Sequence, residues 1–355
     1  MTEIDRASGG SSAGSGRVEW LDVARGLGII LVVWGHVERG LVSAGIADGH
    51  WWTVLDRAVY SFHMPLFIML AGMNVPSSLL KEKTNFLASK LETIAYPYIV
   101  WSLIHGGILL AASRYANTEI DFWDLAQIGW RPIAPFWFLY ALFILMILAS
   151  VFRSWPLLLW PAAALGLAYA QYDSSESLLH QVSYNLIFFA AGVTFSRRLY
   201  GVRFHWFVGP LIAVAWMLAL QVIPSEGKAP YLKPVAVFAG FAGVFGVMFI
   251  AQKARGTVSR HLAVLGRLSM SIYVMHVIVA SGLRIISVQF AGVTSPIILM
   301  VVCTVGGIYV PVLAHAILVR LNLLPLLGLA KRRERSVSDE GRGRLSTGAA
   351  FAERR

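Results

Sequence analysis

The recurrence of long apolar segments is the feature of this sequence that most constrains its fold. A helix that crosses a lipid bilayer needs about 20 mostly apolar residues. Ten segments are candidate spans: 23–43, 58–79, 94–112, 134–152, 156–172, 182–196, 206–223, 234–251, 265–288 and 296–319. The two weakest, 156–172 and 182–196, are short. The pattern predicts an all-α fold, a polytopic membrane helix bundle of about ten transmembrane helices with both termini on one side.

The composition excludes the other broad classes of protein. Hydrophobic residues make up 57% of the chain and charged residues only 14%, whereas soluble domains average about 25% charged residues. A soluble globular protein, an intrinsically disordered chain, collagen and a coiled coil are all excluded on these values. The single cysteine, Cys303, excludes a disulfide framework, a thiolate zinc cluster and an iron–sulfur site. No metal site is expected.

The basic residues are distributed unevenly between the two sides of the predicted bundle. About three quarters of the 30 Lys and Arg residues fall on the side of the N-terminus. Positive charge is enriched in cytoplasmic loops, so we expect both termini to be cytoplasmic. The formal net charge of +11 is therefore a topology signal, and a nucleic-acid partner is not expected. The basic C-terminal tail could contact anionic lipid, although a solvated tail is the simpler interpretation.

Three regions are expected along the chain. Residues 1–16 read as a flexible N-terminal tail that contains the linker SGGSSAGSG, residues 17–320 as the membrane domain, and residues 321–355 as a basic, disordered cytoplasmic tail. No cleavable signal peptide is recognised, so the first span is expected to act as the targeting signal. We expect a multi-pass protein of the inner (plasma) membrane whose surroundings are the lipid bilayer.

The first predicted span carries ionisable groups that are costly in hydrocarbon and therefore indicate function. Arg25 and His36 are eleven residues apart, which places them on one helix face about 16 Å apart along the axis. Asp22 lies one turn before Arg25, where an ion pair is possible. In the predicted orientation, Arg25 lies at the cytoplasmic boundary and His36 lies past the midplane.

The second span adds a histidine at a similar depth. It runs in the opposite direction, so His63 lies in the outer half, near the level of His36. Pro65 is expected to kink this helix because it frees a backbone carbonyl one turn earlier. Asn74 follows His63 by eleven residues, on the same face but nearer the cytoplasm.

The ninth span carries a polar stripe. Ser269, Tyr273 and His276 in the segment SMSIYVMHV have the spacing i, i+4, i+7, which places them on one side of a helix. A single membrane histidine is often a helix-packing hydrogen bonder, and we keep that interpretation for His105 and His315. Three histidines, an arginine and a tyrosine at similar depths on separate helices favour a functional site instead.

Aromatic residues flank the fourth span. Trp130, Trp137 and Tyr140 have the positions of an interfacial aromatic belt. Stacking on a sugar is the alternative interpretation of these residues.

These motifs together resemble the integral-membrane acyltransferase family three, in particular its fucose 4-O-acetylase-like members. The segment LDVARG followed by His36 resembles the family's arginine, ten residues, histidine signature, and SFHMPLFIMLAG resembles its second-helix segment. AYPYIVW, FWFL and SMSIYVMHV follow in the family's order, and the resemblance covers residues 17 to 320. Many relatives have two basic residues before the proline–tyrosine segment, whereas this chain has Lys90 and Thr93.

The resemblance implies transfer of an acyl group, usually acetyl. The usual donor is cytoplasmic acetyl-coenzyme A. The usual acceptor is a hydroxyl of a sugar in an envelope or exported glycan, and in some relatives a macrolide or lipid.

Acyl transfer to a hydroxyl needs a base and stabilisation of a tetrahedral oxyanion. No nucleophile elbow of the GxSxG kind is present, so His36 is the predicted base, with an acyl-histidine intermediate as a variant. We assign the catalytic group to His36, His63, Tyr273 and His276, and the donor-binding group to Asp22, Arg25, Asn74 and Lys90. Arg25 is the predicted phosphate partner because its guanidinium matches phosphate geometry. Tyr273, Asn74 and His63 are alternatives for orienting the base or donating to the oxyanion.

Two other classes of function remain open from the residues alone. A proton-coupled membrane transporter would also use buried histidines, but it would favour paired intramembrane carboxylates or inverted repeats. A membrane receptor or scaffold would leave Arg25 and the histidines unexplained.

Overall fold

The computed structural model describes residues 19–82, 85–111, 121–133, 135–172, 177–224 and 230–330, and these residues are helical with no strand among them. The α-helices are α1 (Glu19–Ser43), α2 (His50–Tyr60), α3 (His63–Glu82), α4 (Phe86–Lys90), α5 (Tyr96–Ala111), α6 (Phe122–Ala126), α7 (Trp137–Val151), α8 (Leu159–Tyr172), α9 (Leu178–Gly201), α10 (Val208–Gln221), α11 (Val237–Lys253), α12 (Gly256–Arg267), α13 (Ser269–Gln289) and α14 (Pro296–Arg320). A π-helical segment, Leu91–Ala95, joins α4 to α5. The predicted tail 1–16, and residues 331–355 of the predicted tail 321–355, lie outside the described residues.

Seven stretches of helix in the described part of the chain are long and apolar enough to cross a membrane: Glu19–Ser43, His50–Lys81, Phe86–Ala111, Leu178–Gly201, Pro234–Lys253, Ser269–Gln289 and Pro296–Arg320. The prediction of a multi-pass, all-α membrane protein is confirmed. The predicted spans 134–152, 156–172 and 206–223 correspond to the shorter helices α7, α8 and α10, which have 15, 14 and 14 residues. The count of ten spans therefore stays a prediction. The segment 182–196 was predicted too short, because α9 has 24 residues.

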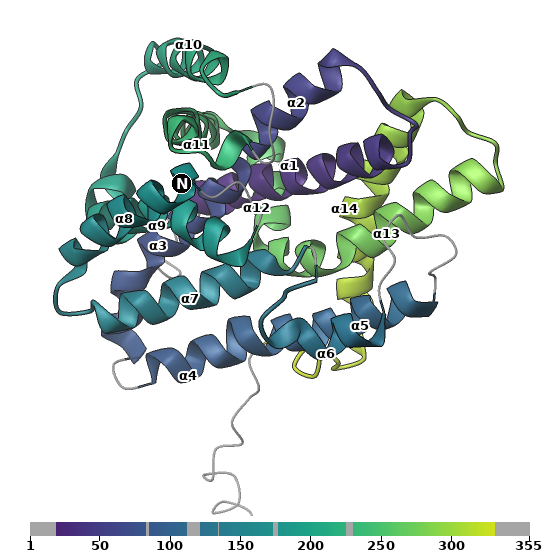
Figure 1. Ribbon diagram of the computed structural model, residues 1–355, viewed down its shortest axis with the longest axis horizontal. Coiled ribbons are helices and arrows are strands. Elements are labelled where there is room, and N and C mark those ends of the chain that lie inside the picture. The colour runs from purple at the N-terminus through teal and green to yellow at the C-terminus, as the bar shows by residue number, and fades with distance from the viewer. Residues whose placement is uncertain are drawn as a thin grey trace, which may run out of the picture.

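Helix α1 lies at the centre of the bundle. In Figure 1 it runs through the middle of the molecule, between α10 and α11 on one side and α4 and α5 on the other. It packs against α2, α3, α11, α12, α13 and α14. This position explains why α1 is apolar on most of its faces, and why its few polar side chains meet residues from several other helices.

Glycines bring the backbones of α1 and α12 into direct contact. A Cβ atom on Gly26 would lie 2.0 Å from the carbonyl oxygen of Leu262, and one on Gly266 would lie 1.8 Å from that of Asp22. Real Cβ atoms do not approach so closely, so both positions need glycine. Small residues at helix interfaces are a common way for membrane helices to pack tightly.

A turn of two residues separates α2 from α3 within the helical stretch His50–Lys81. Residues Ser61 and Phe62 form this turn, and Pro65 lies in the first turn of α3. Proline is tolerated there because the first turn of a helix has N–H groups without intrahelical partners. The kink expected near Pro65 is thus a break between two helices, and it places His63 at the beginning of α3.

The ninth predicted span is shorter than expected. Residues 265–267 belong to α12, and Leu268 separates them from α13. Because α12 packs on α1, this break sets the start of α13, which carries Ser269, Tyr273 and His276.

Residues 321–330 form turns that lie against α5. The Tyr96 hydroxyl donates to the carbonyl of Leu326 at 2.7 Å, and the Trp101 indole Nε1 donates to that of Leu327 at 3.0 Å. The first ten residues of the predicted tail are therefore attached to the membrane helices.

Candidate active site

Three histidines from different helices gather beside α1. The His36 ring of α1 lies 5.0 Å from the His276 ring of α13, measured between centroids. Tyr60, the last residue of α2, links His36 to His63 through edge contacts of 6.5 Å and 4.5 Å. The structure thus brings together His36, His63 and His276, which are 27 to 240 residues apart in the sequence.

The hydrogen bonds of two of these histidines define their tautomers. His63 Nδ1 lies 2.8 Å from the carbonyl oxygen of Val59, and His276 Nδ1 lies 2.6 Å from that of Tyr273. A carbonyl oxygen can only accept, so in each ring Nδ1 carries the proton and Nε2 carries the lone pair of the neutral form. Both Nε2 atoms are buried and have no hydrogen-bond partner among the described residues, and the same holds for the Tyr60 hydroxyl.

Unpartnered buried polar atoms are rare in proteins, and each one calls for an explanation. Three such atoms lie in the cluster around His36. Tyr60 and His276 contact the His36 ring, and His63 contacts the Tyr60 ring. The cluster therefore offers two lone pairs and one hydroxyl proton to a reacting group bound beside His36.

Tyr273 lies next to this cluster but directs its hydroxyl elsewhere. Its hydroxyl donates to the carbonyl of Pro135 at 2.6 Å, and its ring lies 6.0 Å from the ring of His276. Because its hydroxyl proton is taken up by a backbone carbonyl, Tyr273 does not direct a donor toward His36, and the predicted donation to an oxyanion does not fit this geometry.

His105 and His315, for which helix packing is the predicted role, make packing contacts. His105 Nε2 donates to the carbonyl of Val274 at 2.9 Å, and His315 Nδ1 lies 2.8 Å from the hydroxyl of Ser271. These bonds agree with the helix-packing interpretation of both residues.

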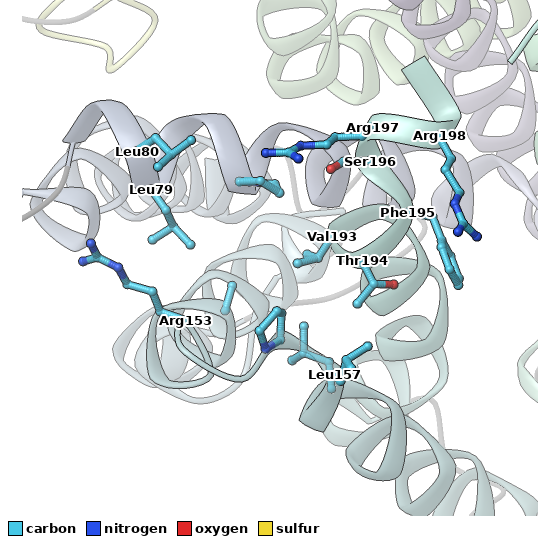
Figure 2. Close-up of a pocket in the computed structure, with 14 residues that line it drawn as sticks. Leu79, Leu80, Arg153, Leu157, Val193, Thr194, Phe195, Ser196, Arg197 and Arg198 are labelled. Carbon is cyan, nitrogen blue, oxygen red and sulfur yellow. The ribbon is translucent and has the colours of Figure 1, made fainter. Parts of the chain in front are cut away.

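Two cavities border the last turns of α3. The larger one, about 640 Å³, is lined by Leu79 of α3, by Arg153 after α7, and by Phe195 and Arg197 of α9. Figure 2 shows that basic side chains border it from different helices around an apolar interior. None of the residues predicted for the site lines this cavity.

The smaller cavity, about 280 Å³, contains three of the four residues predicted to bind the donor. Arg25, Asn74 and Lys90 all line it, together with Thr93 and Ser269. The fourth residue, Asp22, is paired with one of these: Arg25 Nη1 donates to Asp22 Oδ1 at 3.1 Å. The structure thus brings this group together at one end of α1.

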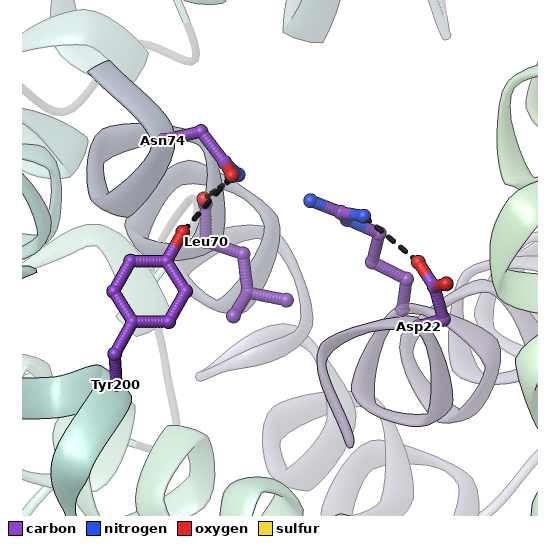
Figure 3. A network of polar contacts seen from close by, with 5 residues as sticks. Asp22, Leu70, Asn74 and Tyr200 are labelled. Atoms are coloured by element: carbon purple, nitrogen blue, oxygen red, sulfur yellow. Dashed lines mark hydrogen bonds and ion pairs between the residues drawn. The ribbon is translucent and has the colours of Figure 1, made fainter. Parts of the chain in front are cut away.

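Asn74 is held in place by neighbours of the cavity. Its Nδ2 donates to the carbonyl of Leu70 at 2.7 Å, and the Tyr200 hydroxyl donates to its Oδ1 at 3.0 Å. Figure 3 shows this chain of hydrogen bonds beside the carboxylate of Asp22. Asn74 therefore belongs with Arg25 rather than with the histidines.

The sequence analysis missed a charged group at the other end of α1. Arg39 Nε and Nη2 donate to the two carboxylate oxygens of Asp56 at 2.6 and 3.1 Å, and the Arg39 guanidinium stacks 3.2 Å from the centroid of the Tyr60 ring. Glu38 is 2% exposed and lies close to both Asp56 and Arg39. The sequence did contain a sign of this group. Glu38 and Arg39 are charged residues that follow His36 by two and three positions, inside a segment predicted to span the membrane.

Among the residues that the structure covers, no three His, Cys, Asp or Glu side chains form a group suited to a metal ion. The histidine cluster fits the class of sites that move protons during acyl transfer, and the basic cavity on the same helix fits an anionic substrate.

Comparison with known proteins supports that class. The sequence profile of the acyltransferase domain family matches residues 18–316. The nodulation protein NolL of Mesorhizobium japonicum is 24% identical over 326 residues, which cover 83% of this chain and 85% of that protein. The nodulation protein NolL of Sinorhizobium fredii is 27% identical over 201 residues, which cover 55% of this chain and 53% of that protein. No solved structure matches.

The protein is thus a multi-pass membrane enzyme that transfers acyl groups. It belongs to the acyltransferase family to which its motifs point. Membership favours the enzyme over the transporter and the receptor. Glu38, which is buried, and Asp56, which is half-buried, are nevertheless the kind of intramembrane carboxylate pair that a transporter would use.

Proposed function

We propose that this enzyme is an O-acetyltransferase that moves an acetyl group from cytoplasmic acetyl-coenzyme A to a hydroxyl of a sugar in an envelope or exported glycan. The observation that carries the proposal is the arrangement along α1. The basic cavity at Arg25 and the histidine cluster at His36 lie on one helix face, about 16 Å apart along the axis. The two NolL relatives are named as nodulation proteins, and family membership supports the acyl transfer.

In this proposal the donor's phosphates bind at the basic end. Arg25 presents a planar fork of N–H groups that matches phosphate oxygens, and Lys90 adds a second positive charge on the same cavity. Asp22 orients Arg25 through their ion pair. The thioester arm then extends along α1 toward His36.

His36 acts as the general base. It takes the proton of the acceptor hydroxyl while that oxygen attacks the thioester carbonyl. The tetrahedral oxyanion collapses, the carbon–sulfur bond breaks, and His36 returns the proton to the departing coenzyme A thiolate. The Tyr60 hydroxyl has no hydrogen-bond partner among the described residues. In this proposal it donates its hydrogen bond to the oxyanion. His276, whose ring lies 5.0 Å from that of His36, stabilises protonated His36 through the lone pair on its unpartnered Nε2.

The direct test uses the purified protein in detergent with acetyl-coenzyme A labelled in its acetyl group. We expect release of coenzyme A thiol and appearance of label in a sugar acceptor such as methyl α-L-fucopyranoside. Cells that lack the gene should also show less acetylation of envelope or secreted glycans. If label transfer is absent from the purified protein and the glycans are unchanged, the proposed activity is wrong.

The proposed topology places both termini and the Arg25 cavity in the cytoplasm. To test it, Cys303 is first replaced by alanine, and single cysteines are introduced at the exposed residues Ser154 and Thr294. A membrane-impermeant thiol reagent should label Thr294→Cys in intact cells, and Ser154→Cys only after the membrane is opened. The reverse labelling pattern would place the Arg25 cavity outside the cytoplasm, and the proposed binding of cytoplasmic acetyl-coenzyme A there would be wrong.

A further inference from the structure

The charged group at the far end of α1 has no part in donor binding. It consists of Glu38, Arg39 and Asp56, with the ring of Tyr60 beneath the guanidinium. Arg39 follows Arg25 by fourteen residues, which corresponds to about 21 Å along the helix. The two charged ends of α1 therefore lie on opposite sides of His36.

The two ends differ in the charge that they present. At the donor end, Arg25 and Lys90 line a cavity with no carboxylate among its lining residues. At the far end, two carboxyl groups face the guanidinium of Arg39, and Arg57 directs its Nη1 to the carbonyl of Ile223 instead. These carboxyl groups would repel the phosphates of a donor. Neutral hydroxyl groups, in contrast, can donate hydrogen bonds to their oxygens.

Glu38 is the member of this group whose hydrogen bonds are incomplete. Its side chain is buried, with 2% of the residue exposed, and its Oε2 has no partner among the described residues. Both fork N–H bonds of Arg39 go to Asp56. A buried carboxyl oxygen without a hydrogen-bond partner is costly, which indicates that a bound ligand supplies the partner.

The outer edge of the group is open to such a ligand. The side chains of Arg39 and Asp56 keep 36% and 22% of their surface exposed, while Glu38 lies deeper. A ligand that reaches the group thus meets a guanidinium and a carboxylate first, and a second carboxylate behind them. Alternating donors and acceptors of this kind match the neighbouring hydroxyl groups of a sugar ring.

Tyr60 connects this group to the candidate base. A Cβ on Gly35 would lie 3.5 Å from the Tyr60 hydroxyl, so this hydroxyl lies against the α1 backbone directly before His36. His36 and Arg39 are three residues apart and so lie on one side of α1. A sugar held at Arg39 would therefore present its next hydroxyl to His36.

We propose that Glu38, Arg39 and Asp56 form the acceptor subsite, which binds the hydroxyl groups of a sugar next to the one that is acylated. This inference rests on the proposed function, because it deepens the sugar assignment for the same active site. The donor end selects the acyl-coenzyme A, and this subsite selects an acceptor with several hydroxyl groups over one with a single hydroxyl.

The test compares three acceptors in the purified full-length protein: methyl α-L-fucopyranoside, ethanol and water. Water as the acceptor is measured as acetyl-coenzyme A hydrolysis. For Glu38→Gln, which keeps the shape of the side chain, we expect kcat/KM for the sugar to fall about ten- to a hundredfold through KM. Transfer to ethanol and to water should stay within about twofold, because neither acceptor has a second hydroxyl for the subsite. Asp56→Asn should show the same selectivity.

The matched control is Glu19→Gln. Glu19 is on the same helix at the opposite end, where its Oε1 accepts from the Ser259 hydroxyl at 3.3 Å. Its replacement should change none of the three rates. Binding of the sugar without donor, followed by saturation-transfer NMR, gives a readout that needs no catalysis.

Each outcome decides between the two proposals. If Glu38→Gln lowers all three rates equally, or leaves sugar transfer unchanged, the subsite is wrong and the proposed function stands. If the parent protein transfers acetyl to no acceptor but binds the sugar in a Glu38-dependent manner, the proposed function is wrong and the subsite stands. If the parent neither transfers to the sugar nor binds it, the subsite is overturned.

Discussion

Replacing His36 by alanine is expected to lower the rate of acetyl transfer by about 10²- to 10⁴-fold, the usual contribution of a general base. The His36 ring contacts the rings of His276 and Tyr60 and forms no hydrogen bond with any described residue, so its loss removes none of the hydrogen bonds that hold this part of the fold. The variant should insert and purify like the parent. The measurement is kcat for transfer of labelled acetyl to the sugar acceptor, with coenzyme A affinity determined in parallel.

Two further variants make this result specific. His36→Gln should be as inactive as His36→Ala, because an amide fills similar space but has no basic nitrogen. His261→Ala is the control, since this exposed histidine of α12 lies outside the cluster and bonds the hydroxyl of Tyr309 at 2.8 Å. Near-normal transfer by His36→Ala, or full activity of His36→Gln, would remove His36 as the base.

Replacing Arg25 by alanine is expected to weaken coenzyme A binding about ten- to a hundredfold. A hydrogen bond to a charged group contributes about 1.5–3 kcal/mol, which corresponds to that range. Arg25→Lys should recover part of the affinity, because the charge remains but the fork of N–H groups does not. The measurement is titration calorimetry of the purified variants with coenzyme A, and affinity for the acceptor should change less.

Asp22 complicates the interpretation of that variant, because Arg25→Ala deprives its buried carboxylate of its ion-pair partner. Adding Asp22→Asn removes this charge, so any loss that persists in the double variant belongs to the donor contact. Arg197→Ala serves as the control, since Arg197 lines the larger cavity beside α9. If Arg197→Ala weakens coenzyme A binding and Arg25→Ala does not, the donor site lies in that larger cavity.

The parts of the site that one helix defines were predictable from the sequence. Arg25 and His36 share a face of α1 because a spacing of eleven residues fixes their relative direction in any regular helix. The depths of His63 and His276 followed from counting residues along predicted spans, and the structure places both near His36. Asn74, predicted from the same spacing, lines the cavity of Arg25.

The contacts that depend on which segments pack together were not predictable. Tyr60 contacts His36 through the packing of α2 on α1, and periodicity carries no information about which helices pack together. The partner of the Tyr273 hydroxyl, the carbonyl of Pro135, comes from the chain that leads into α7. The environment of Glu38 was overlooked because the sequence does not show that Asp56, from the next helix, lies close to it.

The glycine contacts between α1 and α12 restrict how the enzyme can work. Sliding either helix by one residue would bring a side chain to Gly26 or Gly266, where even a Cβ atom has no space. Helix α1 therefore stays in register with α12, and any movement of one of these helices along its axis has to carry the other with it. With donor phosphates at Arg25, the distance along α1 sets one fixed reach to His36. Donors with a shortened pantetheine arm should then bind normally but fail to react.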